Sequence, residues 1–595
     1  MKKIILSLAM AFAALSLMAR PAYPGTIKLV QPDGSTLTVR IHGDEWGHWM
    51  TDAAGRVVAQ DEDGFYRVQE GVTAESVMAA AQVRRQARRS SVSGAAKASG
   101  HVAVGQKHFL VILCQFKDKS FTTPNINAAV TAQLNNSGYS GNGATGSARD
   151  FYYDSSNGYF EPIFDVFGPV TLDNNMSYYG ANDSYGDDVR PEEAVTEGCK
   201  KLDDEIDFKN YDLDKDGYVD MIFMIYAGYG EADGGGSNTI WPHQWELGGY
   251  TTLDGKKLDS YACSNELAGQ GALQGKLDGI GAVCHEFGHA MGLPDFYDVD
   301  YSTNGECGGM YDFSTMDAGS YNNESRTPPY FNTEERILLG WVSESEAYQE
   351  FTGSGSVTIP AYRPENGSTV AYRTPTDMDG EYFVYECRGS QGWDSALAGH
   401  GLMVYHVDKS SRNVKISNGY GTTNVSAYSL WNNWEEYNSI NENGSHPCCY
   451  VIAAKSQGSL NYSGGGNYMV FPGGGGVKSY TAKSWNGVES EYPLSNIAYG
   501  NQASTFTVTV PVPETPLDYP VIANPGNGVY SAGSSFTFAL EESSTRPSAS
   551  VVWYFDGAQV ESASKSLTAG KHTIEAVVTL ESGRKDTVTL EIQVK

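Results

Sequence analysis

The stretch Cys284–Asp295 reads CHEFGHAMGLPD, and its first half decides the fold of the region around it. On a helix, His285 and His289 are four residues apart, so their imidazoles project from one face about a turn apart. This is the H-E-x-x-H arrangement, in which two histidines bind one Zn²⁺. Glu286 stands beside them, where a carboxylate can act as general base on a metal-bound water. The stretch therefore predicts a helix that carries a zinc peptidase site.

Two simpler explanations compete with this prediction. With 11 histidines, an accidental H-E-x-x-H is expected in on the order of 1 in 100 such chains, and a pair of buried structural histidines is the other alternative. The residues downstream argue against both. Gly292 suits the left-handed end of a helix, and Pro294 prevents the helix from resuming. The chain must turn there, which brings Asp295 back towards the metal as a third ligand.

The complete pattern, H-E-x-x-H-x-x-G-x-x-D, has the spacing of the metzincin zinc proteases with aspartate in the last ligand position. Metzincins also place a methionine turn beneath the metal, and Met316 is suitably placed in the sequence for that role. Tyr321, five residues later, is a candidate for stabilising the oxyanion. A competing hypothesis takes the third ligand from a second helix, with Glu334 or Glu335 as candidates.

The start of the chain predicts export. Basic Met1–Lys3 precedes the apolar run Ile4–Met18, which is typical of a signal peptide cleaved after Ala19. No later run of about 18 apolar residues follows, so we expect a soluble mature chain with no transmembrane segment, secreted or held at the cell surface. Eight cysteines in an exported chain permit disulfides, although their pairing cannot be read from the sequence. Cys284 is expected to be a buried free thiol on the helix.

The charge of the chain limits its partners. The 71 acidic residues outnumber 41 basic ones and give a net charge of −30, which argues against nucleic acid and favours cation binding. We expect a monomer that acts on protein or peptide substrates.

Residues 20–104 are predicted to be a β-rich propeptide. Strand-like alternation at Thr26–Val30 and Thr36–Ile41 flanks a Pro-Asp-Gly turn, and Ala74–Arg89 is predicted to be a helix that ends in arginines. A Ser/Ala/Gly-rich linker follows. Cleavage near the arginines would release the propeptide; a permanent N-terminal domain is the alternative. No cysteine precedes Cys114, so a cysteine cap on the zinc is excluded, and an acidic or histidine side chain of this module could cap it instead.

Residues 105–345 are predicted to be the catalytic domain. His108–Phe116, HFLVILCQF, is a continuous apolar run that indicates a central strand. Helices are expected at Ala148–Tyr153 and Pro191–Phe208, and a closing helix at Pro328–Trp341.

A second motif, DLDKDGYVD at 212–220, predicts a structural Ca²⁺ site. Its carboxylates and glycine match the front of an EF-hand loop, and Phe223 stands where the closing glutamate would be expected. Other groups must therefore close the site, and a solvated Asp-rich turn is the alternative. The predicted calcium ligands are Asp212, Asp214, Asp216, Tyr218 and Asp220.

Other histidines are also candidates for site residues. His243, between two tryptophans, is a candidate for the cleft, but a structural role is favoured. A second metal site would have to be built from Asp394, His400, His406 and Asp408. Their spacing fits no helical ligand pair, so polar residues on strand faces are the preferred interpretation.

The order of these motifs resembles the immune inhibitor A family of secreted bacterial metalloproteases over residues 105–510, and the N-terminal module is similar to the propeptides of that family. The matching pieces are HEFGHAMGLPDFYD at 285–298, the 212–220 loop followed by a strand and AGYGE, IWPHQW at 240–245, STMDAGSY at 314–321, EYFVYECRGSQGWD at 381–394, GHGLMVYHVD at 399–408, HPCCYVIAA at 446–454 and FPGGGG from 471. The resemblance implies a zinc endopeptidase with bound calcium, with His285, His289 and Asp295 as zinc ligands and Glu286 as base. Two departures are Tyr226, where many relatives are expected to have histidine, and the missing closing acid of the calcium loop.

The fold class expected for the whole chain is multidomain. An α+β metzincin-like protease domain would follow the propeptide, then a β-sandwich-like domain at 346–510 packed on it, then a linker and an immunoglobulin-like domain at 511–595 with Trp553 inside. The functional alternative is a calcium-stabilised binding or adhesion protein with a degenerate protease fold, which would need a broken ligand or base set. A glycosidase is weaker still, because H-E-x-x-H is not a paired-carboxylate signature.

Overall fold

The computed structural model describes most of the chain in two compact units, Met1–Val510 and Pro511–Lys595. The described residues are 18–44, 47–61, 63–74, 76–77, 103–183, 186–299, 307–364, 371–418, 421–432, 440–457, 460, 466–510, 521–526, 528–541, 548–580 and 585–595. The predicted signal peptide as far as Leu17, most of the predicted helix Ala74–Arg89 and the predicted linker after it lie outside these residues. No helix among the described residues is long and apolar enough to cross a membrane.

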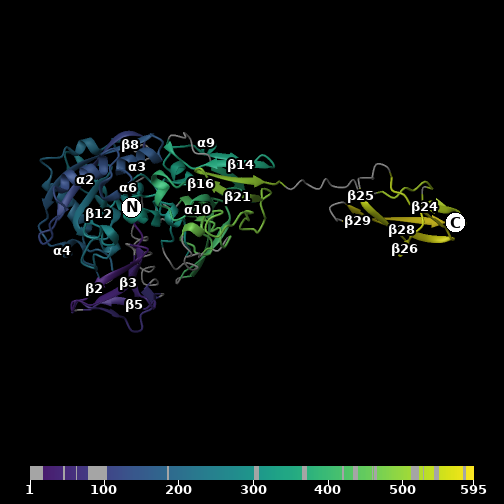
Figure 1. The fold of residues 1–595 in the computed structure, drawn as a ribbon, viewed down its shortest axis with the longest axis horizontal. Helices are drawn as coiled ribbons and strands as arrows, with labels where there is room; N and C mark the ends of the chain where they lie inside the picture. Colours follow the sequence, from purple (N-terminus) through teal and green to yellow (C-terminus); the bar gives the residue numbers. More distant parts are fainter. Residues whose placement is uncertain are drawn as a thin grey trace, which may run out of the picture. The chain divides into compact units, whose positions relative to one another are not determined.

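The largest sheet of the first unit has the strand order β1-β11-β12-β10-β7-β8, with β9 paired to β12. Its strands β8 and β12 are labelled in Figure 1. The strands β12, β10, β7 and β8 run parallel, whereas β11 and then β1 are added antiparallel at one edge. The bounds are β1 Met18–Ala19, β7 Gly105–Gln115, β8 Phe160–Thr171, β9 Tyr218–Val219, β10 Ile222–Tyr229, β11 His243–Leu253 and β12 Lys256–Leu267.

The continuous apolar run in β7 is explained by burial of both faces of the sheet. Phe109, Val111 and Leu113 belong to a core shared with the helix that carries the H-E-x-x-H motif. The alternate residues Leu110 and Ile112 belong to the core on the other side, with the helix at 191–201. A parallel strand covered on both faces reads as uninterrupted apolar sequence rather than as an alternation. The predicted strand at 108–116 is confirmed.

The helices of the first unit are α2 Ile126–Asn135, α3 Ala148–Ser155, α4 Met176–Gly180, α5 Pro191–Lys201, α6 Gly281–Ala290, α7 Asn322–Ser325, α8 Thr333–Leu338, α9 Glu344–Ala347 and α10 Ala427–Asn432. Two of them are shorter than predicted. The helix that begins at Pro191 ends at Lys201, where the acidic residues that follow would interact unfavourably with the C-terminal end of a helix dipole. The closing helix begins only at Thr333, because Asn332 and Glu335 form a capping box there.

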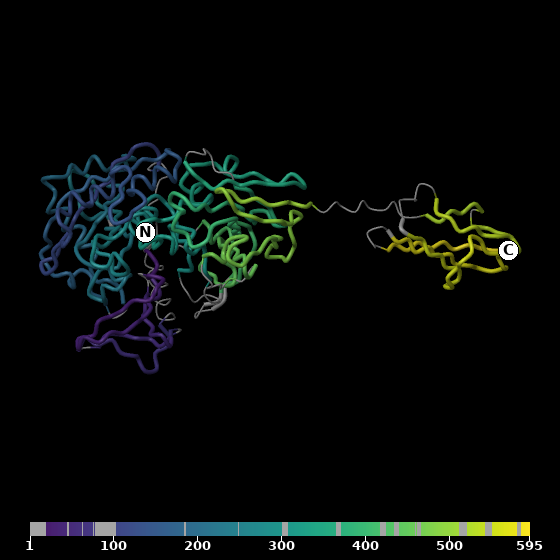
Figure 2. The backbone as a smooth tube through the Cα atoms, viewed as in Figure 1, coloured from purple at the N-terminus to yellow at the C-terminus, as the bar shows by residue number. Residues whose placement is uncertain are grey.

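The N-terminal module is a five-stranded antiparallel sheet in the order β2-β3-β4-β5-β6, drawn in purple in Figure 2. Its strands are β2 Thr26–Val30, β3 Thr36–Asp44, β4 Gly47–Asp52, β5 Val57–Gln60 and β6 Tyr66–Val68. The apolar face of this sheet packs against Ala232 and Trp241, which follow β10 and precede β11. The two strands predicted in this module are confirmed.

Residues 346–510 form β-rich structure that shares its core with the large sheet. One sheet has the order β13-β15-β16-β17-β20, a second has the order β14-β22-β21, and β18 pairs with β19. The bounds are β13 Tyr348–Glu350, β14 Gly355–Pro360, β15 Ala371–Pro375, β16 Glu381–Arg388, β17 Gly401–Asp408, β18 Asn413–Asn418, β19 Gly421–Ser426, β20 Cys449–Val451, β21 Leu494–Gly500 and β22 Ala503–Val508. Val384 and Tyr405 lie in the same cluster of buried side chains as Phe287 of α6.

The second unit has its own core. Its larger sheet has the order β23-β29-β28-β25-β26, and β24 pairs with β27. The bounds are β23 Val529–Tyr530, β24 Ser535–Thr537, β25 Ser548–Phe555, β26 Ala558–Val560, β27 Ser564–Ser566, β28 Gly570–Leu580 and β29 Lys585–Val594. Trp553 on β25 packs against Phe538, with 5.6 Å between ring centroids.

Candidate metal centre and active site

The helix α6 is buried, and the turn after it brings Asp295 back beside His285 and His289. Every residue from Gly281 to His289 is buried. Gly292 adopts a left-handed φ of 99°, and the amide of Leu293 donates to the carbonyl of Gly288 at 3.0 Å. This is the helix ending that the sequence predicts, because a glycine carries no Cβ to clash in that conformation.

Three polar atoms converge beside α6. The Nε2 atoms of His285 and His289 are 3.1 Å apart, and Oδ1 of Asp295 lies 3.2 and 3.3 Å from them. A tetrahedral Zn²⁺ site with bonds of about 2.0–2.1 Å has edges of about 3.3–3.4 Å between ligand atoms. The three atoms therefore fit one face of a zinc tetrahedron, and the remaining position is open for a water or a substrate oxygen.

Both histidines are oriented by backbone carbonyls. Nδ1 of His285 lies 2.8 Å from the carbonyl oxygen of Thr315, and Nδ1 of His289 lies 2.8 Å from that of Leu293. A carbonyl oxygen can only accept a hydrogen bond, so Nδ1 carries the proton in both rings. The Nε2 lone pairs are thereby directed at the shared position, as in protein zinc sites.

The residue predicted for the methionine turn lies directly under α6. Met316 is fully buried, and a Cβ added at Gly288 would lie 2.5 Å from its sulfur. The amide of Phe296 donates to the carbonyl of Met316 at 2.9 Å, which joins this turn to the segment that carries Asp295. Asp317 holds the turn by accepting backbone N–H groups, and burial raises its pKa to about 8.

The competing third ligands lie elsewhere. Glu334 accepts hydrogen bonds from Tyr348 and Tyr382 and pairs with Lys409 at 2.8 Å. Glu335 caps its own helix, where it accepts from the amide of Asn332. The geometry therefore favours Asp295 over both glutamates.

Glu286 lies beside the three ligand atoms and is fully buried. Burial raises the pKa of its carboxyl well above the usual value, and the neighbouring Asp295 raises it further. Its Oε1 accepts a hydrogen bond at 3.0 Å from the backbone amide of Arg20. The hydroxyl of Tyr321 donates to the carbonyl of Pro21 at 2.8 Å. A segment of the N-terminal region therefore lies in the site.

Comparison with known proteins agrees with this geometry. Residues 100–336 match the immune inhibitor A peptidase M6 catalytic domain. Residues 100–336 belong to the immune inhibitor A peptidase family. The family resemblance predicted from the motifs is thus confirmed for this M6 domain.

Two curated relatives match part of the chain. The pre-pro-metalloprotease PrtV of Vibrio cholerae is 30% identical over 227 residues, which cover 35% of this chain and 23% of the relative. Immune inhibitor A of Bacillus thuringiensis subsp. alesti is 27% identical over 213 residues, which cover 32% and 31%. The chain thus matches less than a third of the length of either relative. Among solved structures, OgpA from Akkermansia muciniphila covers 84% of the chain and 96% of its own at 11% identity, with a TM-score of 0.21 that is too low to support an argument.

The segment in the cleft of the M6 domain was not predicted. The sequence indicates that an acidic or histidine side chain of the N-terminal module could cap the metal, which stays a prediction, and it does not indicate the contact of a backbone amide with Glu286. Arg20 and Glu286 are 266 positions apart, so no local pattern could have paired them.

The predicted calcium loop brings three of its carboxylates together. Ligand atoms of Asp212, Asp214 and Asp216 all lie within 4.8 Å of one another. Burial raises the pKa of Asp220 to about 7, and its carboxylate accepts from the amide of Leu213 within the loop. Lys256 forms a close ion pair with Asp212. The donor set fits Ca²⁺ on the chemistry of its oxygens, with an ammonium group as competitor for one of them.

The remaining candidates of the M6 domain have structural partners. His243 is buried, with Nδ1 2.6 Å from the carbonyl of Trp241 and Nε2 2.7 Å from the hydroxyl of Tyr261. Tyr226, which stands where the resemblance led us to expect histidine, donates to the carbonyl of Ile240 at 2.6 Å. Both side chains lie inside the fold around β11.

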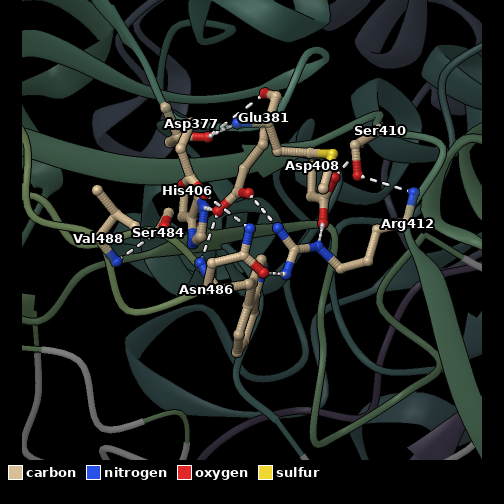
Figure 3. A network of polar contacts seen from close by, with 12 residues as sticks. Asp377, Glu381, His406, Asp408, Ser410, Arg412, Ser484, Asn486 and Val488 are labelled. Atoms are coloured by element: carbon tan, nitrogen blue, oxygen red, sulfur yellow. Dashed lines mark hydrogen bonds and ion pairs between the residues drawn. The ribbon is translucent and has the colours of Figure 1, made fainter.

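The residues considered for a second metal site do not share one position. Figure 3 shows His406 against Glu381, with 3.0 Å between Nε2 and Oε1, and Arg412 joining Glu381 to Asp408. Asp394 instead forms an ion pair with Arg388 at 2.6 Å. His406 and Asp408 lie on β17 and are satisfied by ion pairs there, as the sequence interpretation favours. Asp394 lies in the 3-10 helix Gly392–Ala396, and His400, just before β17, stacks on Tyr499 with 6.4 Å between ring centroids.

Proposed function

We propose that this protein is a zinc-dependent endopeptidase that hydrolyses peptide bonds of extracellular proteins. His285, His289 and Asp295 would hold the zinc, and Glu286 would act as general base. The observation that carries the proposal is the near-equilateral triangle of Nε2, Nε2 and Oδ1 atoms with edges of 3.1–3.3 Å beside a buried glutamate. A bound Zn²⁺ supplies polarisation of the scissile carbonyl and a water of lowered pKa.

The residues around the zinc position would transfer the proton and bind the substrate. Glu286 takes a proton from the attacking water and returns it to the leaving amine nitrogen. The Arg20 nitrogen, 3.0 Å from Oε1, supports this assignment because it occupies the place of such an amine. Tyr321 bonds to the carbonyl of Pro21, which supports a role in holding the substrate backbone. Its predicted role at the oxyanion stays a prediction.

We extend the proposal to the rest of the chain as predicted from the sequence. Residues 1–19 would direct export, 20–104 would be a propeptide, and 105–345 would be the metzincin-like catalytic domain. Residues 346–510 would be a β-rich domain packed on it, and 511–595 would be a linker and an immunoglobulin-like domain. Contacts of residues 20–23 inside the cleft support the propeptide, because a bound segment excludes substrate. The loop at 212–220 would bind Ca²⁺.

The alternative, a binding or adhesion protein with a degenerate protease fold, is not favoured. It requires the loss of a zinc ligand or of the base. All four groups are present and adjacent in this chain.

Casein cleavage by the processed wild type and by Glu286→Gln tests the proposal, with zinc content measured in both. We expect zinc in both proteins and a loss of roughly 10²- to 10⁴-fold in rate for the variant. The exposed Glu205→Gln is the matched control and should keep full activity. A wild type that holds zinc but leaves casein and other unfolded proteins intact would contradict the endopeptidase, and the absence of zinc from all three would contradict the metal site.

A further inference from the structure

The segment Met18–Tyr23 lies in the cleft in the manner of an extended peptide. Met18 and Ala19 form β1, which pairs antiparallel with the edge strand β11, Met18 opposite Gln244 and Ala19 opposite His243. An extended peptide that adds a strand to a sheet edge gains main-chain hydrogen bonds whatever its sequence. The pairing therefore fixes the direction in which a peptide chain passes α6.

The backbone around Arg20 identifies the peptide bond that lies at the catalytic carboxylate. The amide of Arg20 donates to Glu286 Oε1 at 3.0 Å, and its carbonyl accepts from Nε1 of Trp241 at 3.1 Å. In peptide hydrolysis the nitrogen next to the general base becomes the leaving amine. The bond in this position is Ala19–Arg20, which is also the bond predicted for signal cleavage. In the precursor the Arg20 side chain occupies the place of the residue directly after a scissile bond, and in the exported chain Arg20 would be the N-terminal residue.

The side chain of Arg20 is enclosed in a pocket of matching chemistry. It is 1% exposed, and its guanidinium carbon lies 3.4 Å from the centroid of the Tyr321 ring. Nη2 donates to Oγ of Ser325 at 2.6 Å and approaches the carbonyl oxygen of Ser320 at 3.4 Å. An aromatic face with two oxygen acceptors suits a planar guanidinium better than an ammonium group.

Two buried carboxyl groups interact electrostatically with the charge of Arg20. Burial raises the pKa of Asp233 to about 7 and raises that of Asp278, while the positive charge of Arg20 opposes the rise at both. Asp233 accepts from the amide of Gly269 at 3.0 Å, and Asp278 accepts from that of Gly279 at 2.7 Å. A neutral side chain in the pocket would remove the charge that favours the ionised form of both carboxyl groups.

We infer that the pocket formed by Tyr321, Ser320 and Ser325, within the electrostatic influence of Asp233 and Asp278, is the subsite for the residue directly after the scissile bond and selects arginine there. The inference rests on the proposed peptidase function and names its preferred substrates, proteins with accessible X–Arg bonds. The chain's own Arg20 fills the subsite while the N-terminal segment is bound. Lysine should be accepted less well, and neutral residues poorly.

Peptide pairs test the subsite on the enzyme as isolated after processing. Two fluorogenic peptides would differ only in the residue directly after the scissile bond. This residue is arginine in one peptide and citrulline, its uncharged isostere, in the other. We expect kcat/KM to be roughly 10- to 100-fold higher for arginine, the range expected for losing a charge-assisted hydrogen bond. Asp278→Asn should move this ratio towards one, whereas the exposed Asp204→Asn should leave it unchanged. In a digested protein library, new N-termini should begin predominantly with arginine.

A second measurement, of thermal stability, tests the binding of Arg20 in the pocket independently of catalysis. The melting temperature would be measured for three full-length proteins that all carry Glu286→Gln. One keeps Arg20, the second carries Arg20→Lys and the third carries Arg20→Met. We expect stability to fall in that order, because the lost guanidinium contacts are buried. Arg56→Met, which removes an exposed arginine of the same module, should leave the melting temperature unchanged.

The two measurements separate the failures. Library hydrolysis without arginine at the new N-termini, and equal kcat/KM for arginine and citrulline, would overturn the subsite and leave the peptidase standing. A zinc-loaded enzyme that cleaves no peptide would contradict the peptidase function. The melting temperatures of the Arg20 variants would then decide whether the guanidinium pocket exists. A loss confined to the Arg20 variants supports the guanidinium pocket, and equal melting of Arg20→Met and Arg56→Met overturns it.

Discussion

The third metal ligand is the residue whose assignment depends most on the structure. Oδ1 of Asp295 completes the triangle with the two histidines, whereas Glu334 is held by Lys409 and two tyrosines. Asp295→Asn should weaken zinc binding by more than the roughly 10- to 100-fold that follows the loss of a hydrogen-bond partner of a ligand. Zinc affinity, measured by competition with a chelator, checks this. Glu334→Gln should retain zinc, and the reverse result would move the third ligand to the second helix.

Residues close in sequence were predictable, and residues brought together by the fold were not. His285, His289 and Asp295 follow one another across a single helix ending, so helix periodicity and the Gly292 turn were enough to group them. Arg20 reaches the same site from 266 positions away, through pairing with an edge strand that no local pattern identifies.

At the scale of elements, the contact between α6 and the methionine turn should tolerate little added volume. A Cβ at Gly288 would lie 2.5 Å from the sulfur of Met316. Gly288→Ala should therefore destabilise the fold by about 1–3 kcal/mol, as overpacking of a core does, and displace His289 next to it. Thermal unfolding and zinc content measure the two effects. Gly353→Ala, where a Cβ would meet nothing within 4 Å, is the control. Equal melting temperatures for the two variants would refute the tight contact.

The acidic loop before β10 gives a prediction about calcium. Three carboxylates within 4.8 Å of one another repel, and a bound Ca²⁺ would relieve that repulsion and stabilise the folded state. Calcium should raise the melting temperature of the wild type, and Asp214→Asn should reduce this rise, unlike Asp204→Asn outside the loop. Equal melting in calcium and in chelator would favour the solvated Asp-rich turn.

The type of each element was easier to predict than its limits. The strand at 108–116 is present because its apolar run is long and uninterrupted. The helix from Ala148 is short, and a capping box of Ser147 and Asp150 begins it. The helix from Pro191 was predicted too long, since its end depends on the charges that follow Lys201 rather than on periodicity. Element ends are set by caps and dipoles, which are weaker signals than a buried face.

At the scale of the whole first unit, the N-terminal module is joined to the M6 domain by apolar and charged contacts together. Trp241 lies in the core of the module's sheet and also bonds to the carbonyl of Arg20 in the cleft. His48 of β4 stacks on the same tryptophan, with 4.5 Å between ring centroids. Displacement of the module would therefore disturb the contact that holds the segment at Glu286.

The ion pair of His48 with Glu231 makes this attachment depend on pH. Burial lowers the pKa of His48, but Glu231, 3.0 Å away, and Asp187 more than offset it, so the pKa lies above the usual 6.5. The stabilisation is then complete below the unfolded pKa and is lost as pH rises through the folded one. His48→Gln should lower the melting temperature more at about pH 6 than at about pH 9. His42→Gln is the matched control, because burial lowers the pKa of His42 to about 4 and the ring stays neutral over that range. A destabilisation by His48→Gln that is as large at the higher pH would show that the charge of His48 does not hold the module.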